Sequence, residues 1–438
     1  MKFRLGSLPL RLAMVVSMIA APAMPAVSGT PDEPHARPAD EDFTFFVTPY
    51  QFGAKGDGAA DDTEAIAAAL KKADETCGVL YFPAGTYKTD VITVPPGVVL
   101  KCEQTWSYQR CGRVSIIPAR EDQPCLLDMS NAIGATVFGL DLDGRKMGTQ
   151  MHGILTSREE KTERDEHTFR VDNCRVHGFT GDGFHLRGFW AIWVRHSMAI
   201  ANGGNGVYVD GCDAWFIDNV LANNGKAGFG GDTWNSAITF TGNRVEWNKE
   251  CGVKLCGSIR FSLVANYFDR SYGPAIIVDS APNYHRRLDR HHTVMPCCIT
   301  ITGNNIVRSG KGAEPGSDYD CQILLRNSAG VSITGNTFNV WKDDSSAGRP
   351  TPGYGIVVEK CAHCVISGNV MMAGATMELI HDKGGHGEQV IITDNAGAVI
   401  PEKALGSRDP FTPVHYMLEG DAPWYRDMLK GEKNNGEE

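Results

Sequence analysis

The residues FTGNRVEWNKECGVKLCG (240–257) are one unit of a repeat that runs through the middle of the chain. Two earlier stretches, VRHSMAIANGGNGVYVDG (194–211) and FIDNVLANNGKAGFGGD (216–232), have the same order of parts. Asparagines recur at positions 219, 243 and 266, and further ones follow at longer intervals. A period of about 22–24 residues built from short apolar runs indicates a solenoid.

Each unit ends in an alternating run such as GVYV (206–209) or GVKL (252–255), which is typical of a strand with one face toward a core. One unit cannot bury that face alone, so successive units must stack. With three short strands per turn, the sequence predicts an all-β fold, a parallel β-helix.

The recurring asparagines have a structural explanation. Asparagine tolerates the left-handed backbone of a tight turn, and its amide can bond to the equivalent asparagine one coil away. We therefore expect a structural ladder rather than a catalytic set from Asn219, Asn243, Asn266, Asn304, Asn336 and Asn369.

A solenoid must cover its open ends. In FGAKGDGAADDTEAIAAAL (52–70), we expect Asp61 to be a helix N-cap, with Glu64 completing a capping-box-like arrangement. The predicted helix, at about 62–73, would lie over the first coil. Its apolar face comprises Ile66, Ala69, Leu70 and Ala73.

The segments YQFGAKGDGAADDTEAIAAALKKA (50–73) and GVLYFPAGTYKT (78–89) resemble the N-terminal signature of the pectate lyase superfamily. This group includes rhamnogalacturonase- and epimerase-like proteins, and the resemblance implies a right-handed parallel β-helix over 43–400. Its members include polysaccharide lyases, glycoside hydrolases, epimerases and phage tailspikes, so the resemblance implies a fold rather than one reaction. The catalytic motifs of polygalacturonase-type hydrolases do not match here, and none of their residues is carried over.

The two ends of the chain differ in composition from the repeat. Residues 1–28 combine basic residues, the apolar run LAMVVSMIAAPAM (12–24) and small residues, which is typical of a cleaved signal peptide. We expect a flexible linker over 29–42, a C-terminal tail over 401–438 and a secreted or periplasmic protein without a membrane span. The net charge of -10 argues against nucleic acid as a partner.

Aligning the second strand of each coil gives two outward columns of side chains. The first runs through His185, Tyr208, Gly230 and Lys254, and the second runs through Arg187, Asp210, Asp232, Cys256 and Asp279. The glycines beside them leave a low floor on which a sugar chain could lie. We predict a groove over coils 181–280. Its candidate catalytic residues are His185, Asp210, Asp232, Lys254 and Asp279, and its candidate substrate-binding residues are Arg187, Tyr208, Arg286 and Arg287.

Several mechanisms fit these residues. Asp210 and Asp232, on adjacent coils, would lie roughly 5 Å apart, which suits a retaining carboxylate pair or a shared Ca²⁺. Asp232 and Asp279, two coils apart, approach the spacing of an inverting pair. For a lyase, Lys254 or His185 would take the proton α to a uronate carboxylate, with Arg187 or Ca²⁺ stabilising the anion.

The predicted function is therefore an exported enzyme that cleaves an acidic polysaccharide by β-elimination or hydrolysis. The alternative is a non-catalytic glycan-binding or surface protein on the same scaffold.

Among the 13 cysteines, Cys102 and Cys111 flank a short loop and could pair. Cys361 and Cys364 fit a local disulfide or buried thiols better than a metal site, and no metal site is predicted from the cysteines.

Overall fold

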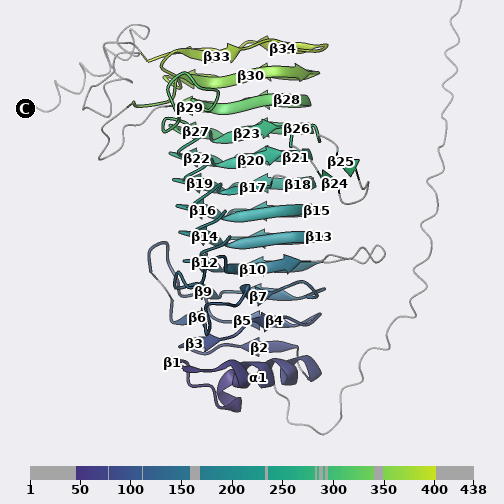
Figure 1. Cartoon of the computed structure of the whole chain (residues 1–438), viewed down its shortest axis with the longest axis vertical. Helices are drawn as coiled ribbons and strands as arrows, with labels where there is room; N and C mark the ends of the chain where they lie inside the picture. The colour runs from purple at the N-terminus through teal and green to yellow at the C-terminus, as the bar shows by residue number, and fades with distance from the viewer. Residues whose placement is uncertain are drawn as a thin grey trace, which may run out of the picture. The chain divides into compact units, whose positions relative to one another are not determined.

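The computed structural model describes residues 46–400, with gaps at 77, 111, 158–167, 232–234, 282–283, 286–289, 292–293 and 340–348 (Figure 1). Backbone alone is described at 284–285 and 290–291. The expected signal peptide, linker and C-terminal tail lie outside the described residues. Within the described part of the chain, no helix has the length and apolar character needed to span a membrane.

The strands form three parallel ladders, and each ladder is one face of a β-helix. Two of them join into a 20-stranded sheet because the long strands β13, β15 and β28 belong to both, while the third is a 13-stranded sheet. In Figure 1 the coils stack from α1 at the purple end to β33 and β34 at the yellow end. The predicted all-β parallel β-helix is confirmed.

The first ladder consists, in order, of β4 (Ile92–Thr93), β7 (Cys125–Asp128), β10 (His152–Ser157), β13 (Phe184–Arg195), β15 (Val207–Ile217), β17 (Phe229–Gly231), β20 (Val253–Cys256), β23 (Ile276–Asp279), β28 (Cys321–Thr334), β30 (Tyr354–Ala362) and β33 (Glu378–Asp382).

The second ladder shares β13, β15 and β28 and adds β2 (Val79–Tyr81), β5 (Val99–Lys101), β8 (Thr136–Phe138), β11 (Phe169–Asp172), β18 (Asn235–Thr241), β21 (Ser258–Val264), β26 (Cys297–Thr302), β31 (Cys364–Ser367) and β34 (Val390–Thr393).

The third ladder consists of β1 (Asp57–Asp61), β3 (Gly85–Thr89), β6 (Val114–Pro118), β9 (Asp141–Asp143), β12 (Arg175–His177), β14 (Met198–Ile200), β16 (Val220–Ala222), β19 (Arg244–Glu246), β22 (Tyr267–Asp269), β27 (Asn305–Val307), β29 (Thr337–Asn339), β32 (Val370–Met372) and β35 (Ala396–Ala398). A short hairpin of β24 (Tyr284–His285) and β25 (Arg290–His291) stands apart from the three ladders.

The predicted asparagine ladder runs along one corner of the β-helix. At each step, the backbone N–H and the Nδ2 of one asparagine donate to Oδ1 of the next, as between Asn219 and Asn243 at 2.9 and 3.0 Å. The ladder reaches beyond the predicted set to Asn395. Because these side chains are buried, the ladder satisfies turn amides that would otherwise lack partners.

A second asparagine ladder was not predicted. Asn202 donates to Asn224, and Asn224 donates to Asn248, through both N–H and Nδ2 at 3.0–3.2 Å. It lies at the turns between the third and first ladders, just before β15, β17 and β20. These turns lead into the strands that form the floor of the candidate site described below.

The first coil is covered by α1 (Thr63–Glu75), preceded by a 3-10 turn, η1 (Pro49–Phe52). The predicted apolar face is confirmed, since Ile66, Ala69, Leu70 and Ala73 are buried.

The predicted cap of this helix is wrong. The N-cap is Asp62, and its carboxylate accepts the backbone N–H groups of Lys55 and Gly56 rather than capping the helix. Asp61 accepts instead from the N–H and hydroxyl of Thr63. The two adjacent aspartates therefore have different roles. Asp61 binds the first residue of the helix, and Asp62 binds the loop at Lys55 and Gly56.

The cysteines of the described chain are free thiols, most of them buried. The Cys102 thiol is free and donates to the carbonyl of Gly139 at 3.1 Å, and its expected partner Cys111 lies outside the described residues. Cys361 and Cys364 are buried thiols, the second of the two alternatives for that pair.

Candidate active site

The outer surface of the first ladder carries a depression of about 560 Å³. Its floor follows four coils because His185, Tyr208, Gly230 and Lys254 lie in register on β13, β15, β17 and β20. Their strand neighbours on either side are buried, so alternation turns these residues outward. This is the first outward column predicted from the sequence, with the predicted register.

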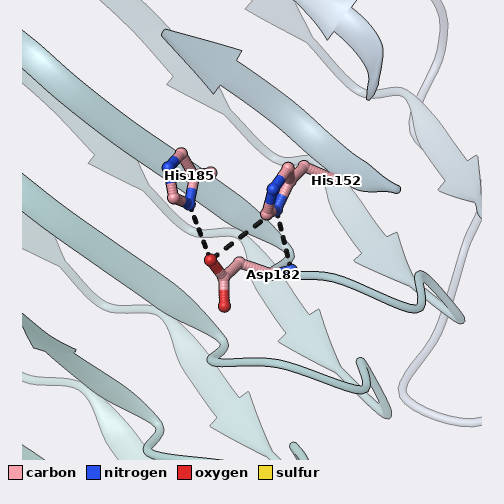
Figure 2. A group of neighbouring side chains, drawn as sticks. All are labelled: His152, Asp182 and His185. Carbon is pink, nitrogen blue, oxygen red and sulfur yellow. Dashed lines mark hydrogen bonds and ion pairs between the residues drawn. The ribbon is translucent and has the colours of Figure 1, made fainter. Parts of the chain in front are cut away.

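Three titratable side chains meet at one end of the depression (Figure 2). His152 begins β10, Asp182 lies in the turn before β13, and His185 is the second residue of β13. The Asp182 carboxylate lies 2.7 Å from Nδ1 of His185 and 3.6 Å from Nδ1 of His152, while its backbone N–H donates to His152 Nδ1 at 2.9 Å.

These contacts determine where the protons lie. Nδ1 of His152 accepts from a backbone amide, so its neutral ring carries its proton on Nε2. Nδ1 of His185 faces the Asp182 carboxylate, so it carries the proton, and Nε2 keeps a lone pair. The two histidines therefore differ: His185 can accept a proton at Nε2, and His152 can donate a hydrogen bond from Nε2.

The Asp182 carboxylate is held in its charged form. Burial by itself raises the pKa of Asp182, but hydrogen bonds from His185 and the Asn205 amide outweigh it, and the net pKa is lowered. Asn205 supplies two of these bonds, from its backbone N–H at 2.6 Å and from Nδ2 at 2.9 Å. Only glycine fits at 204, because a Cβ there would collide with Asp182 Oδ1.

The His152 ring is kept neutral. Its pKa is lowered to about 4 in total: burial is the largest cause, the neighbouring His185 adds to the shift, and Asp182 opposes it. Its ring centroid lies 4.3 Å from that of His185. A second cation this close to His185 would oppose protonation of that base, so a neutral His152 favours proton transfer to His185.

Tyr208 and Lys254 continue the floor of the depression beyond His185. The Tyr208 ring stacks on His185 with centroids 4.7 Å apart and planes at 8°. Gly230, which has no side chain, occupies the next place in the column. Beyond it, Lys254 Nζ donates to Glu250 Oε1 at 2.9 Å. A flat ring, a glycine and a cation thus follow one another along the floor.

The His152, Asp182 and His185 group is also compact enough to be considered as a metal site, with one ligand atom from each within 4.8 Å of the others. Ca²⁺ prefers oxygen ligands, and two of the three donors here are imidazole nitrogens. The Asp182 N–H donates to Nδ1 of His152, and Nδ1 of His185 faces the Asp182 carboxylate, so both Nδ1 atoms already have hydrogen-bond partners. The hydrogen-bond pattern thus accounts for the group without an ion.

The predicted residues Arg187 and Asp210 lie in register on β13 and β15, in the second outward column. Arg187 Nε is 3.6 Å from Asp210 Oδ2. They form an ion pair beside the depression and do not line it.

Asp279 lies further along the same column and is engaged by other residues. Its carboxylate accepts from Arg326 Nε and Nη2 at 3.0 and 2.7 Å, from Asn327 Nδ2 at 2.9 Å and from the Ser280 N–H at 2.7 Å. These four donors engage the Asp279 carboxylate, and Asp279 is not among the residues that line the depression with His185 and Lys254.

The remaining predicted residues, Asp232, Arg286 and Arg287, lie outside the described residues. Their assignment as catalytic or substrate-binding residues stays a prediction.

The sequence-based prediction missed His152, Asp182 and Glu250. All three lie in turns or at the first residue of a strand, where alternation along a strand does not indicate side-chain direction. The available signal was the run GDGFH (181–185), in which an acid precedes a histidine by three residues beside close-packing glycines.

Two family models match the chain. Residues 47–98 match rhamnogalacturonase A/epimerase, pectate lyase-like, and residues 152–290 match the right handed beta helix region. The first match covers α1 and the first coils, and the second includes the residues that line the depression except Thr149 and Gln150.

Curated relatives are similar at low identity. Depolymerase 1, capsule K30/K69-specific, of Klebsiella phage K5-2 is 24% identical over 57% of this chain and 32% of its own length. Alginate lyase 7 of Azotobacter vinelandii is 27% identical over 41% of this chain and 22% of its own length. The chain thus spans about a third or less of the length of these curated relatives.

Among solved structures, the A-module of the Azotobacter vinelandii mannuronan C-5 epimerase AlgE6 is 18% identical, with a TM-score of 0.60. The match covers 80% of this chain and 99% of that module, and at this identity it shows the fold. The repeat, the three parallel ladders and the two family matches agree on a right-handed parallel β-helix, and the matched N-terminal segment is similar to pectate lyase-like proteins.

Proposed function

We propose that this protein acts on a uronate-containing polysaccharide by removing the C5 proton, α to the sugar carboxylate, with His185 as the base. The observation that carries the proposal is the Asp182–His185 contact of 2.7 Å, because it leaves a lone pair on His185 Nε2 at the wall of the depression. Names of relatives that mention alginate lyase and mannuronan epimerase support the same chemistry, since both reactions begin at C5.

In the first step, the C5–H bond breaks, the proton passes to His185 Nε2, and the electron pair is delocalised into the carboxylate. The anionic Asp182 stabilises the imidazolium that forms, in the manner of a buried carboxylate behind a catalytic histidine. Neutral His152 adds no opposing charge. Cationic groups near the sugar carboxylate stabilise the developing anion, and the described lysines that line the depression are Lys226 and Lys254.

Two outcomes can follow. In β-elimination, the electron pair forms a C4–C5 double bond, the C4–O bond breaks, and the leaving oxygen takes up a proton. In epimerisation, C5 is reprotonated from the opposite face. Tyr208 and the Nε2–H of His152 are the proton donors next to His185. Our proposal covers the shared first step.

Hydrolysis receives less support from the described site. A glycosidase needs two carboxyl groups on either side of the scissile bond. The described carboxylates that line the depression are Asp182 and Glu250, and each is already bound, to His185 and to Lys254.

The signal-peptide-like N-terminus supports the further proposal that the reaction takes place outside the cytoplasm; cell fractionation of the tagged full chain tests this.

The proposal is tested by incubating the protein with alginate, polygalacturonate and dextran. An ultraviolet-absorbing unsaturated product from an acidic polymer supports elimination, and deuterium uptake at C5 from heavy water without chain cleavage supports epimerisation. New reducing ends without either signal would instead support a hydrolase, and no reaction would support the glycan-binding alternative.

A further inference from the structure

A second outward surface carries two tryptophans that the candidate active site does not use. Trp193 of β13 and Trp215 of β15 lie in register on the second ladder. Their strand neighbours Ile192, Val194 and Ala214 are buried, so alternation turns both indoles away from the core. Both side chains are half-buried at the surface of the coil.

The two indoles stack on each other, with centroids 4.5 Å apart and planes at 6°. This separation is close to the spacing of neighbouring strands, so the ring planes face along the coil axis. On the far side of Trp193, the exposed Arg170 places its guanidinium carbon 5.1 Å from the ring centroid. Both faces of Trp193 are therefore covered, and one face of Trp215 is turned toward the next coil.

The next coils present only small side chains in this column. Trp215 is in register with Thr239, and the column continues through Ser262, Thr300 and Ser332. A threonine is too small to cover an indole fully, so Thr239 leaves part of that face of the half-buried Trp215 uncovered. The four hydroxyl residues are half-buried or exposed and form a flat polar track along the coil axis.

We propose that Arg170, Trp193, Trp215 and the hydroxyl track form a second polysaccharide-binding surface, which we call the tryptophan platform. An indole face is matched by the C–H face of a sugar ring, because both are flat and apolar. Hydroxyl groups on the track can donate to and accept from sugar hydroxyls. The exposed Arg170, whose guanidinium lies over the Trp193 ring, can donate N–H groups to a carboxylate, which selects an acidic chain.

The platform lies on the same strands as the depression. Trp193 follows His185 by eight residues on β13, and Trp215 follows Tyr208 by seven on β15. At about 3.3 Å per residue, the path along the strand is roughly 25 Å, with a register shift after Arg187. The platform would therefore hold a stretch of polymer remote from the reacting sugar. The acidic nature of the polymer rests on the proposed function, while the stacking does not.

The experiment measures retention of the protein in native gels that contain alginate, polygalacturonate or dextran. A His185→Ala background keeps the polymer intact. We expect Trp215→Ala to weaken retention by an acidic polymer about tenfold, and Trp215→Tyr to restore most of it. The matched control is Trp247→Ala, because Arg270 lies 5.1 Å from the Trp247 ring in the same arrangement on another side of the coil.

The platform is overturned if Trp215→Ala binds as tightly as its parent, if Trp247→Ala weakens retention equally, or if neither acidic polymer retains the parent. The failure of the proposed function can be distinguished from the failure of the platform. If retention depends on Trp215 but the wild type forms no product, the proposed function is wrong and the platform is still supported. In an active enzyme, Trp215→Ala should raise KM for long polymer and leave kcat and the turnover of short oligomers unchanged.

Discussion

The carboxylate of Asp182 lies 2.7 Å from Nδ1 of His185, and this contact decides which nitrogen of His185 carries its proton. Asp182 is itself positioned by its neighbours, since its N–H donates to His152 and its Oδ1 accepts twice from Asn205. A turn residue thereby sets the chemistry of a strand residue three positions later.

Asp182→Asn should lower kcat/KM on an acidic polymer by about a hundredfold or more, because the neutral amide stabilises the His185 imidazolium poorly. The measurement is the initial rate of product formation across pH. Asp279→Asn is the matched control, since Asp279 binds Arg326 outside the depression. Equal losses in the two variants would indicate that the Asp182 effect is structural.

His152 links stability to pH. Its folded-state pKa of about 4 lies below the ordinary 6.5, so between these values the unfolded chain binds a proton that the folded chain does not. This contribution is present above pH 6.5 and is lost as the pH falls toward 4, by about 3 kcal/mol in full. His152→Gln should flatten this part of the slope in denaturant unfolding at several pH values. An unchanged slope would contradict the assignment.

Chelation should leave activity unchanged. The hydrogen bonds within the His152, Asp182 and His185 group account for its inward atoms, and nitrogen donors suit Ca²⁺ poorly. The rate should be the same after dialysis against EDTA as before it, and added Ca²⁺ or Zn²⁺ should not raise it. A rate that falls on chelation and returns with one metal would show that an ion takes part.

The asparagine ladder should dominate local stability. Asn243 Oδ1 accepts from both the N–H and the Nδ2 of Asn219, and its own Nδ2 donates to the Phe216 carbonyl at 2.9 Å. Asn243→Ala would leave these buried groups without partners, at a cost of about 3–5 kcal/mol. The free energy of unfolding measures this, and a loss below about 1 kcal/mol would show that the ladder is not needed at this coil.

Much of the fold could be predicted from the sequence because a solenoid repeats one register. The column through His185, Tyr208 and Lys254 follows from alternation along each strand and a fixed repeat length, and the structure places these residues in the predicted register. The cap of α1 could not be predicted in the same way. Asp61 and Asp62 have equal capping propensity, and only the folded loop of Lys55 and Gly56 selects Asp62 for another partner.

The site was only partly predictable. His185, Tyr208 and Lys254 are strand residues, and they do line the depression. His152 is the first residue of β10, and Asp182 lies in the turn before β13, so the direction of each side chain depends on the conformation of a turn. Asp279 has the right residue type and the right column, but Arg326 and Asn327, which bind it, follow in the sequence by more than forty residues. Pairing between distant coils is what residue type and spacing alone do not reveal.

The most direct test of proton abstraction by His185 is a reaction with alginate in heavy water, followed by NMR of the C5 position and by ultraviolet absorbance. The wild type should either incorporate deuterium at C5 or form the unsaturated product, and His185→Ala should do neither while still folding. New reducing ends without either signal, or full activity in His185→Ala, would contradict the account.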